Sequence, residues 1–177
     1  MTAVAAAGYL AKVSEAIVQM LADSATFQTL VGAANAAAAK TRIVEDDAGR
    51  SDDEGGVSTA VDGSTFNPAT TNWGVVMLGD ENPREERALR TTGRSGSFSI
   101  MLIIRPSDPT DDPASAKRRA RNTASAVADG VQALFGASTS RICGGSCVVS
   151  SCSKADAIRS LAGAYVAILD GTWRDVP

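Results

Sequence analysis

Two charged clusters are the residues of this 177-residue chain whose types and spacing could support chemistry. The first cluster crowds acidic side chains into the window 45–54: Glu45, Asp46, Asp47, Asp52, Asp53 and Glu54. The second places basic side chains within five positions: Lys117, Arg118, Arg119 and Arg121. Grouped carboxylates can bind Mg²⁺ or Ca²⁺, and grouped cations can bind a carboxylate or a phosphate. These clusters of opposite sign are therefore the first candidate sites.

The acidic cluster does not have the ligand spacing of a calcium-binding loop. A flexible segment that orders around a metal also loses conformational entropy. We interpret window 45–54 as a solvated or subunit-facing segment, and we expect no bound metal or cofactor. The alternative is a small metal-assisted hydrolase that uses these acids or the pair Asp80–Glu81.

Catalytic equipment is otherwise missing from the sequence. There is no histidine, and the pair Asp80–Glu81 has no second positioned carboxylate for acid–base work. Walker, dinucleotide-binding and nucleophile-elbow motifs are also absent. We therefore predict that the protein is not an enzyme.

The basic cluster lies near the start of a predicted helix. On a helical wheel Arg118 and Arg121 point away from the apolar stripe, while Lys117 and Arg119 flank it. One interpretation is a solvated face with local salt bridges. The other is an electrostatic interface with an acidic neighbour, such as segment 45–54 of an adjacent copy. Sequence-specific binding of nucleic acid is disfavoured, because the net charge is −3 and no aromatic residues are interleaved.

Three cysteines, Cys143, Cys147 and Cys152, fall in one short stretch. An odd number gives no disulfide framework, and without histidine a zinc site would need a fourth ligand from elsewhere. We interpret them as reduced, semi-buried side chains on a hairpin; a Cys143–Cys147 disulfide is the alternative. The N-terminus shows neither a signal peptide nor a membrane span, so the protein is expected to be made in a cytoplasm.

The first half of the chain predicts helices followed by a polar segment. Apolar residues at helical spacing predict a helix over 3–22, and Asp23–Ser24 caps a second helix that ends at Gly32. The alanines 36–39 either extend that helix or fray. A short strand begins over 42–44. Residues 45–72 then form a long polar insertion, either a flexible loop or an arm that reaches another subunit.

The second half alternates strands with one long helix. A strand over 73–78 ends at Gly79–Asp80 and is followed by a charged connector over 80–90. The strand over 95–104 has apolar residues on both faces. A helix begins at Asp111-Asp112-Pro113 and ends at Gly136. Its apolar stripe consists of Ala116, Ala120, Ala124, Val127, Val131 and Leu134, with Phe135 beside it.

The chain then predicts a hairpin over 142–152 and a final strand over 161–173, with a bulge near Gly171. Together the elements predict a single α+β domain over 1–177. Its small, mixed, mostly antiparallel sheet has the N-terminal helix and the long helix packed on one face. Apolar residues make up 44% of the chain but aromatic ones only 5%. Such a thin, alanine-rich core is typical of protomers that pack against neighbours, and equally of alanine-rich bacterial proteins.

This layout resembles a known family over nearly the whole chain. The residues that carry it are the turn Asp-Ser-Ala-Thr-Phe-Gln-Thr-Leu-Val-Gly at 23–32, the strand Gly-Ser-Phe-Ser-Ile-Met-Leu-Ile-Ile-Arg at 96–105, the helix over 117–135 and the closing strand Gly-Ala-Tyr-Val-Ala-Ile-Leu-Asp-Gly-Thr-Trp at 163–173. Their order resembles the tail terminator (tail completion) proteins of long-tailed bacteriophages and their neck relatives.

The resemblance implies a mixed sheet with helices on one face and a virion protein that forms a ring of six copies. Such a ring caps the tail tube, faces the head connector or stopper protein, and leaves its bore open to DNA. The expected location is the virion tail, after assembly in the host cytoplasm. Alternatives are another head–tail joining or tube protein, or a soluble adaptor for one host protein. The candidate interface residues are Asp46, Asp47, Asp52, Asp53, Lys117, Arg118, Arg119 and Arg121.

Overall fold

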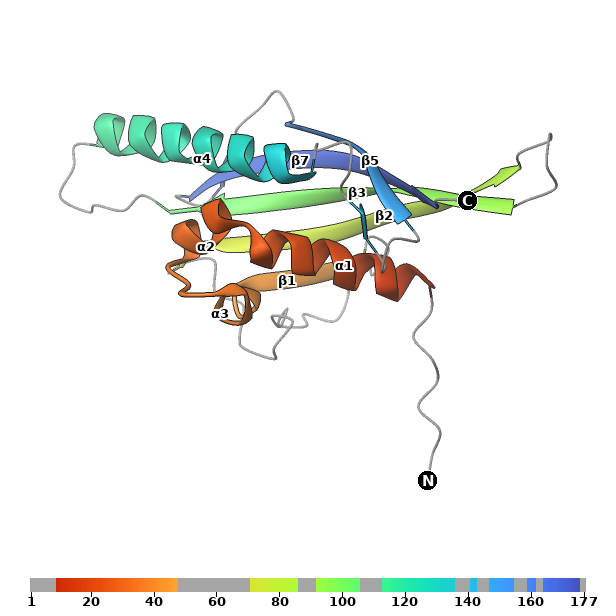
Figure 1. Cartoon of the computed structure of the whole chain (residues 1–177). Helices are drawn as coiled ribbons and strands as arrows, with labels where there is room; N and C mark the ends of the chain where they lie inside the picture. Colours follow the sequence, from red (N-terminus) through yellow and green to blue (C-terminus); the bar gives the residue numbers. More distant parts are fainter. Residues whose placement is uncertain are drawn as a thin grey trace, which may run out of the picture.

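A seven-stranded sheet organises the molecule in the computed structural model (Figure 1). The structure describes residues 9–47, 71–85, 92–105, 113–135, 141–142, 147–154, 159–161 and 164–175. The helices are α1 (Tyr9–Asp23), α2 (Ala25–Val31), α3 (Ala36–Lys40) and α4 (Pro113–Phe135). The strands are β1 (Ile43–Asp47), β2 (Trp73–Glu85), β3 (Thr92–Ile104), β4 (Arg141–Ile142), β5 (Cys147–Lys154), β6 (Arg159–Leu161) and β7 (Ala164–Asp175).

The strand order is β1-β2-β3-β7-β5-β4, and β6 pairs with the start of β7 beside β5. Among the described strands only β1 and β2 run parallel, and the other pairs are antiparallel. Helices α1 and α4 lie on the same face of the sheet, with α2 between them (Figure 1). Helix α1 packs over β1 and β2, whereas α4 packs over β7, β5 and β3. The prediction of an α+β fold with a mixed, mostly antiparallel sheet is confirmed.

Local signals set the boundaries of the short helices. The Ser24 hydroxyl accepts a hydrogen bond from the Phe27 N–H at 3.4 Å and so caps α2. Gly32 ends α2 in the left-handed conformation, with φ of 68°. Asn35 then caps a separate helix by accepting from the Ala38 N–H at 2.9 Å. The alanines therefore neither extend α2 nor fray, because a new cap restarts the helix after Gly32.

Two apolar clusters occupy the two faces of the sheet. Beneath the helices, alternate residues of β3 are fully buried: Phe98, Ile100, Leu102 and Ile104. They pack with residues of α1, α2 and α4, among them Ile17, Leu21, Phe27 and Phe135. The opposite face carries a smaller cluster: Val44, Trp73, Val75, Ile103, Ala164 and Val166. The predicted two-sided burial of β3 is confirmed.

One position on the predicted stripe of α4 is wrong. Leu134 is 39% exposed, whereas Phe135 is fully buried with Val127 and Val131. Ala124 and Ala128 are also fully buried, so the buried face of α4 is centred on the side of Phe135 rather than on that of Leu134. Phe135 packs against Phe98, with ring centroids 5.8 Å apart.

The predicted end of the strand at 78 is also wrong, as is the predicted charged connector over 80–85; its remaining residues, 86–90, lie outside the described residues. Strand β2 continues through an irregularity between Leu78 and Glu81, and then pairs with β3 from Glu81–Gly96 to Glu85–Thr92. On the other side of β3, the pairing with β7 ends at the Ser95–Arg174 pair. Residues 81–85 and 92–94 therefore form a two-stranded ribbon that projects beyond the helix-covered part of the sheet (Figure 1). We call these residues the ribbon.

Two further strand boundaries differ from the prediction. Window 45–54 starts inside a strand, since β1 runs to Asp47 in parallel register with β2. Leu161 belongs to β6, which forms a hairpin with β7 through the Leu161–Ala164 pair. The irregularity expected near Gly171 lies in the partner strand, where β5 shifts register between Val149 and Ser151. Residues 3–8 of the predicted first helix and residues 48–70 lie outside the described residues.

Candidate binding pocket between α2 and α4

The structure places the two charged clusters on different parts of the molecule. Glu45 is exposed on the edge strand β1, where its carboxylate accepts a hydrogen bond from the Ser14 hydroxyl at 2.5 Å. The backbone of Asp46 and Asp47 continues β1, while Asp52, Asp53 and Glu54 lie outside the described residues. Arg118, Arg119 and Arg121 are exposed on α4, and Lys117 belongs to the same helix.

These clusters do not meet within one protomer. Helix α4 packs over β3, β7 and β5, and β2 separates β1 from β3. Neighbouring strands lie about 4.8 Å apart, so β1 is roughly 14 Å from β7, across three strand spacings. The acidic edge and the basic helix are therefore on opposite sides of the protomer.

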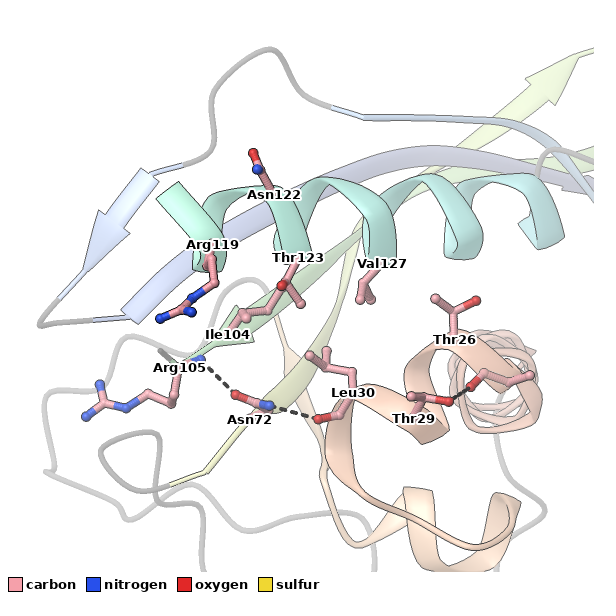
Figure 2. Close-up of a pocket in the computed structure, with 11 residues that line it drawn as sticks. Thr26, Thr29, Leu30, Asn72, Ile104, Arg105, Arg119, Asn122, Thr123 and Val127 are labelled. Atoms are coloured by element: carbon pink, nitrogen blue, oxygen red, sulfur yellow. Dashed lines mark hydrogen bonds between the residues drawn. The ribbon is translucent and has the colours of Figure 1, made fainter. Parts of the chain in front are cut away.

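A pocket of about 680 Å³ lies between α2 and the first half of α4 (Figure 2). Leu30, Ile104 and Val127 provide its larger apolar side chains. Its polar side chains are Thr26, Thr29, Asn72, Arg105, Arg119, Asn122 and Thr123. Among the predicted interface residues whose side chains are described, Arg119 lines this pocket and Arg118 and Arg121 do not.

One glycine sets the distance between the helices beside the pocket. A Cβ atom on Gly130 of α4 would lie 2.5 Å from the Thr26 hydroxyl oxygen of α2. Glycine at 130 thus permits a close approach of the two helices. The pocket opens on the N-terminal side of this crossing, where α4 contributes Arg119, Thr123 and Val127.

The Asn72 side chain joins the end of α2 to the end of β3. Its amide nitrogen donates to the Leu30 carbonyl at 2.8 Å, and its amide oxygen accepts from the Arg105 N–H at 2.7 Å (Figure 2). Next to it, Arg42 lies over the Trp73 ring at 5.3 Å from the centroid and donates to the Thr71 hydroxyl at 3.4 Å. Of these contacts, the two Asn72 hydrogen bonds lie at the wall of the pocket.

The described lining of the pocket includes two arginines, Arg105 and Arg119. Guanidinium groups bind carboxylates and phosphates through paired hydrogen bonds, and amides and hydroxyls can add further donors. None of the described lining residues is a histidine, a cysteine or a carboxylate.

Sequence reasoning found Arg119 but missed Asn72 and Arg105. These two residues flank strands, Asn72 just before β2 and Arg105 just after β3. The antiparallel pairing of Trp73 with Ile103 brings them together. Both are polar residues directly next to a predicted apolar strand, and this position was the sequence feature that could have indicated them.

Of the three cysteines, only Cys152 has a described side chain. Cys152 is free and buried, and burial, followed by the Asp170 charge, raises the pKa of its thiol to about 11. This thiol is therefore protonated at neutral pH and a poor nucleophile. Cys143 lies outside the described residues. Within the described part of the chain, no group of three or more cysteine or acidic residues is placed to hold a metal ion.

Asp80 and Glu81 belong to β2 rather than to a loop. None of the described helices combines the length and apolarity needed to cross a membrane.

The chain matches no protein-family model, and no curated protein is similar to it.

Proposed function

We propose that the protein is a structural virion protein of the tail terminator class, which assembles head to tail into a ring. The observation that carries this proposal is the placement of an acidic edge, which begins at Glu45, on the side of the protomer opposite the arginines of α4. A closed ring needs two different complementary surfaces on each protomer. Opposite charges on opposite sides meet this requirement.

The ribbon supports assembly by a separate argument. Residues 81–85 and 92–94 pair with each other beyond the reach of β7. A two-stranded hairpin without a packed face is only marginally stable in water. Contact with a neighbouring protomer, or with a tube subunit, would stabilise the ribbon.

The resemblance in chain layout supplies the biological setting. In this proposal the ring, of six copies, caps the finished tail tube and faces the connector or stopper protein of the head. In this proposal the protein acts by docking rather than by catalysis. Another neck ring or a tube subunit is the alternative within the same structural class.

The test is whether the purified protein forms closed rings. Negative-stain electron microscopy and sedimentation velocity at high protein concentration, with and without tail tubes, measure this directly. We expect rings of uniform diameter that bind one end of a tube. A protein that stays monomeric both alone and with tubes would overturn the proposal. Binding along the tube, or incorporation into it, would instead indicate a tube subunit.

Charge reversal tests the surfaces themselves. Because Arg118 and Arg121 are exposed on α4, the double variant Arg118→Glu/Arg121→Glu is expected to fold normally. It should assemble less well, with the larger loss at low salt, where exposed charges are less screened. Assembly equal to that of the unmodified protein would exclude this face of α4 from the interface.

A further inference from the structure

We propose that the ribbon contacts the neighbouring copy of the chain in the ring, and that a β-bulge at Gly79 and Asp80 sets the direction in which the ribbon meets that copy. This inference rests on the proposed function. It names the second copy as the partner of the ribbon and the bulge as the element that fixes the angle between neighbours.

The junction between the packed sheet and the ribbon contains one extra residue in β2. Opposite Ser97 of β3, strand β2 has two residues, Gly79 and Asp80. Such a bulge bends the strand that contains it and increases the local right-handed twist. A Cβ atom on Gly79 would overlap the Ser97 hydroxyl, so glycine lets the two strands stay close at the bulge. The ribbon therefore leaves the sheet in a direction that differs from that of a regular hairpin.

The bulge lies close to the point where the outer strands stop pairing with the hairpin. Strand β1 pairs with β2 up to Leu78, and β7 pairs with β3 up to Ser95. Farther out, within the described part of the chain, the ribbon strands form a ladder only with each other. Neither β1 nor β7 therefore straightens the bend that the bulge introduces.

A buried tryptophan packs against β3 at the same junction. Trp173 of β7 belongs to the core beneath the helices, and it pairs with Gly96 of β3. A Cβ atom on Gly96 would come within 2.8 Å of the Trp173 ring, so the ring lies directly on the backbone of this glycine. Packing thus holds β3 in place while β2 bends. One fixed strand and one bent strand give the ribbon a single direction.

A fixed direction matters because each copy in a ring has to meet the next at one angle. A head-to-tail contact closes into a ring when the rotation between copies allows closure, and it gives open filaments when the rotation does not. The ribbon extends beyond the bulge, and Glu81 and Glu85 are roughly 14 Å apart along β2 (Figure 1). A small change in direction at Gly79 moves the far end of the ribbon by a larger distance. The bulge is therefore placed where it can decide whether neighbouring copies close a ring.

Residual dipolar couplings measure the direction of the ribbon before assembly. The ¹⁵N-labelled protein is partially aligned below the concentration at which it assembles. The N–H couplings of 81–85 and 92–94 should fit the same alignment tensor as those of 73–78 and 98–104. Ribbon couplings that average towards zero, while those of the sheet do not, would overturn the inference.

Deletion of Gly79 removes the bulge and keeps the strand pairs on both sides of it. Asp80 then lies opposite Ser97, and the ladder becomes regular. We expect an unchanged circular dichroism spectrum and a cooperative urea transition. The ribbon couplings should no longer agree with those calculated from the unmodified structure, and rings of the original diameter should be lost. Rings of unchanged diameter from this folded variant would overturn the inference.

Two further variants separate the bulge from the residues that form it. Deletion of Asp80 should have the same effect as deletion of Gly79, because it removes the same bulge. Asp80→Ala is the matched control, since it keeps the bulge and should assemble like the unmodified protein. Loss of rings in Asp80→Ala would show that the side chain is required, and would overturn the role of the bulge. Should both deletions fail to fold, the dipolar couplings and the cross-links described next decide the question.

Cross-linking in the assembled protein identifies the partner of the ribbon. A photo-reactive residue at position 82, in a mixture of ¹⁴N and ¹⁵N protomers, should give mixed-isotope cross-links. Cross-links only within one chain, or only to the tube protein when tubes are present, would contradict a contact between copies.

The outcomes separate this inference from the proposed function. Rings that form equally well with and without the bulge leave the ring proposal standing and overturn the role of the bulge. Failure of the ring proposal has a different signature, because the unmodified protein then stays monomeric with and without tubes, whatever the couplings show.

Discussion

The two ends of the β2–β3 hairpin differ in what surrounds them. At one end, 73–78 pairs with 98–103 between β1 and β7, and α1, α2 and α4 cover one face of the sheet. At the other end the ribbon pairs only with itself in the described structure. The same backbone ladder thus belongs to a packed core at one end and to a projection at the other. The residues that stabilise this protomer and those available to neighbours are therefore separated along a single hairpin.

The largest expected effect comes from a charge at the packed end. Leu102 is fully buried on the helix-covered face of β3, so Leu102→Asp would bury an unpaired carboxylate. We expect the protomer to unfold, and Ile100→Asp to do the same, as measured by circular dichroism and size-exclusion chromatography. Arg94→Asp, which places the same side chain in the ribbon, should remain folded. A cooperative transition close to that of the unmodified protein for Leu102→Asp would contradict the assigned core.

A cavity at the same end should have the next largest effect. The Phe98 ring packs over Gly171 of β7 and against Phe135. Phe98→Ala is expected to lower the free energy of unfolding by about 3–5 kcal/mol in urea titrations. Gly171→Val should also destabilise the protein, because its side chain would overlap the ring. In the Phe98→Ala background the same change should cost much less, and simple additivity of the two changes would rule out this contact.

Removing the Asn72 link should cost less than either change in the core. Asn72→Ala leaves the Leu30 carbonyl and the Arg105 N–H without their side-chain partner. We expect a loss of about 1–3 kcal/mol in the free energy of unfolding. Asn72→Asp is the matched control, because its carboxylate can still accept from Arg105 and should restore part of the loss. Equal losses in the two variants would mean that the bond to Arg105 contributes nothing measurable.

Shortening the ribbon should barely change stability. Replacing 83–94 by Asn-Gly keeps the Glu81–Gly96 and Asn82–Ser95 pairs and closes the hairpin with a favoured two-residue turn. The free energy of unfolding should change by about 1 kcal/mol or less, while assembly should fall sharply. A loss of stability as large as that of Phe98→Ala would erase the contrast between the two ends.

The smallest expected effect is a change in stability that occurs only at alkaline pH. Cys152 of β5 pairs with Gly171 of β7. Folding raises the pKa of the Cys152 thiol from 9.0 to about 11. The folded protein therefore holds this proton more tightly than the unfolded chain. The resulting stabilisation is complete below pH 9 and is lost as pH rises towards 11. The unfolding free energy of the unmodified protein minus that of Cys152→Ala should be constant from pH 7 to 8. This difference should decrease above pH 9.

Much of the packed end was predictable because its signals are local. The Ser24 and Gly32 caps depend on neighbouring residues, and the burial of β3 follows from the alternation of large apolar side chains. The ribbon was missed because pairing between polar strands needs only backbone groups, which leave no hydrophobic period. Leu134 and Phe135 are adjacent on the helix, so periodicity alone could not rank them.

The pocket was predictable only in part. Arg119 belongs to a visible basic cluster, but Asn72 and Arg105 are 33 residues apart and converge through strand register. Register depends on the packing of both strands against the helices, which no local pattern encodes. The separation of the acidic edge from α4 likewise depends on strand order, because β1 could have paired elsewhere in the sheet.

The central place of β7 has a consequence for how the chain folds. This strand enters between β3 and β5, and its pairs with β3 join residues from 61 positions apart (Ile104 with Tyr165) to 79 positions apart (Ser95 with Arg174). Such distant pairings close large loops and slow folding. Until β7 arrives, the apolar strand β3 has one unpaired edge, which can pair with other chains. Refolding should therefore give the highest yield from dilute protein, before the concentration is raised for assembly.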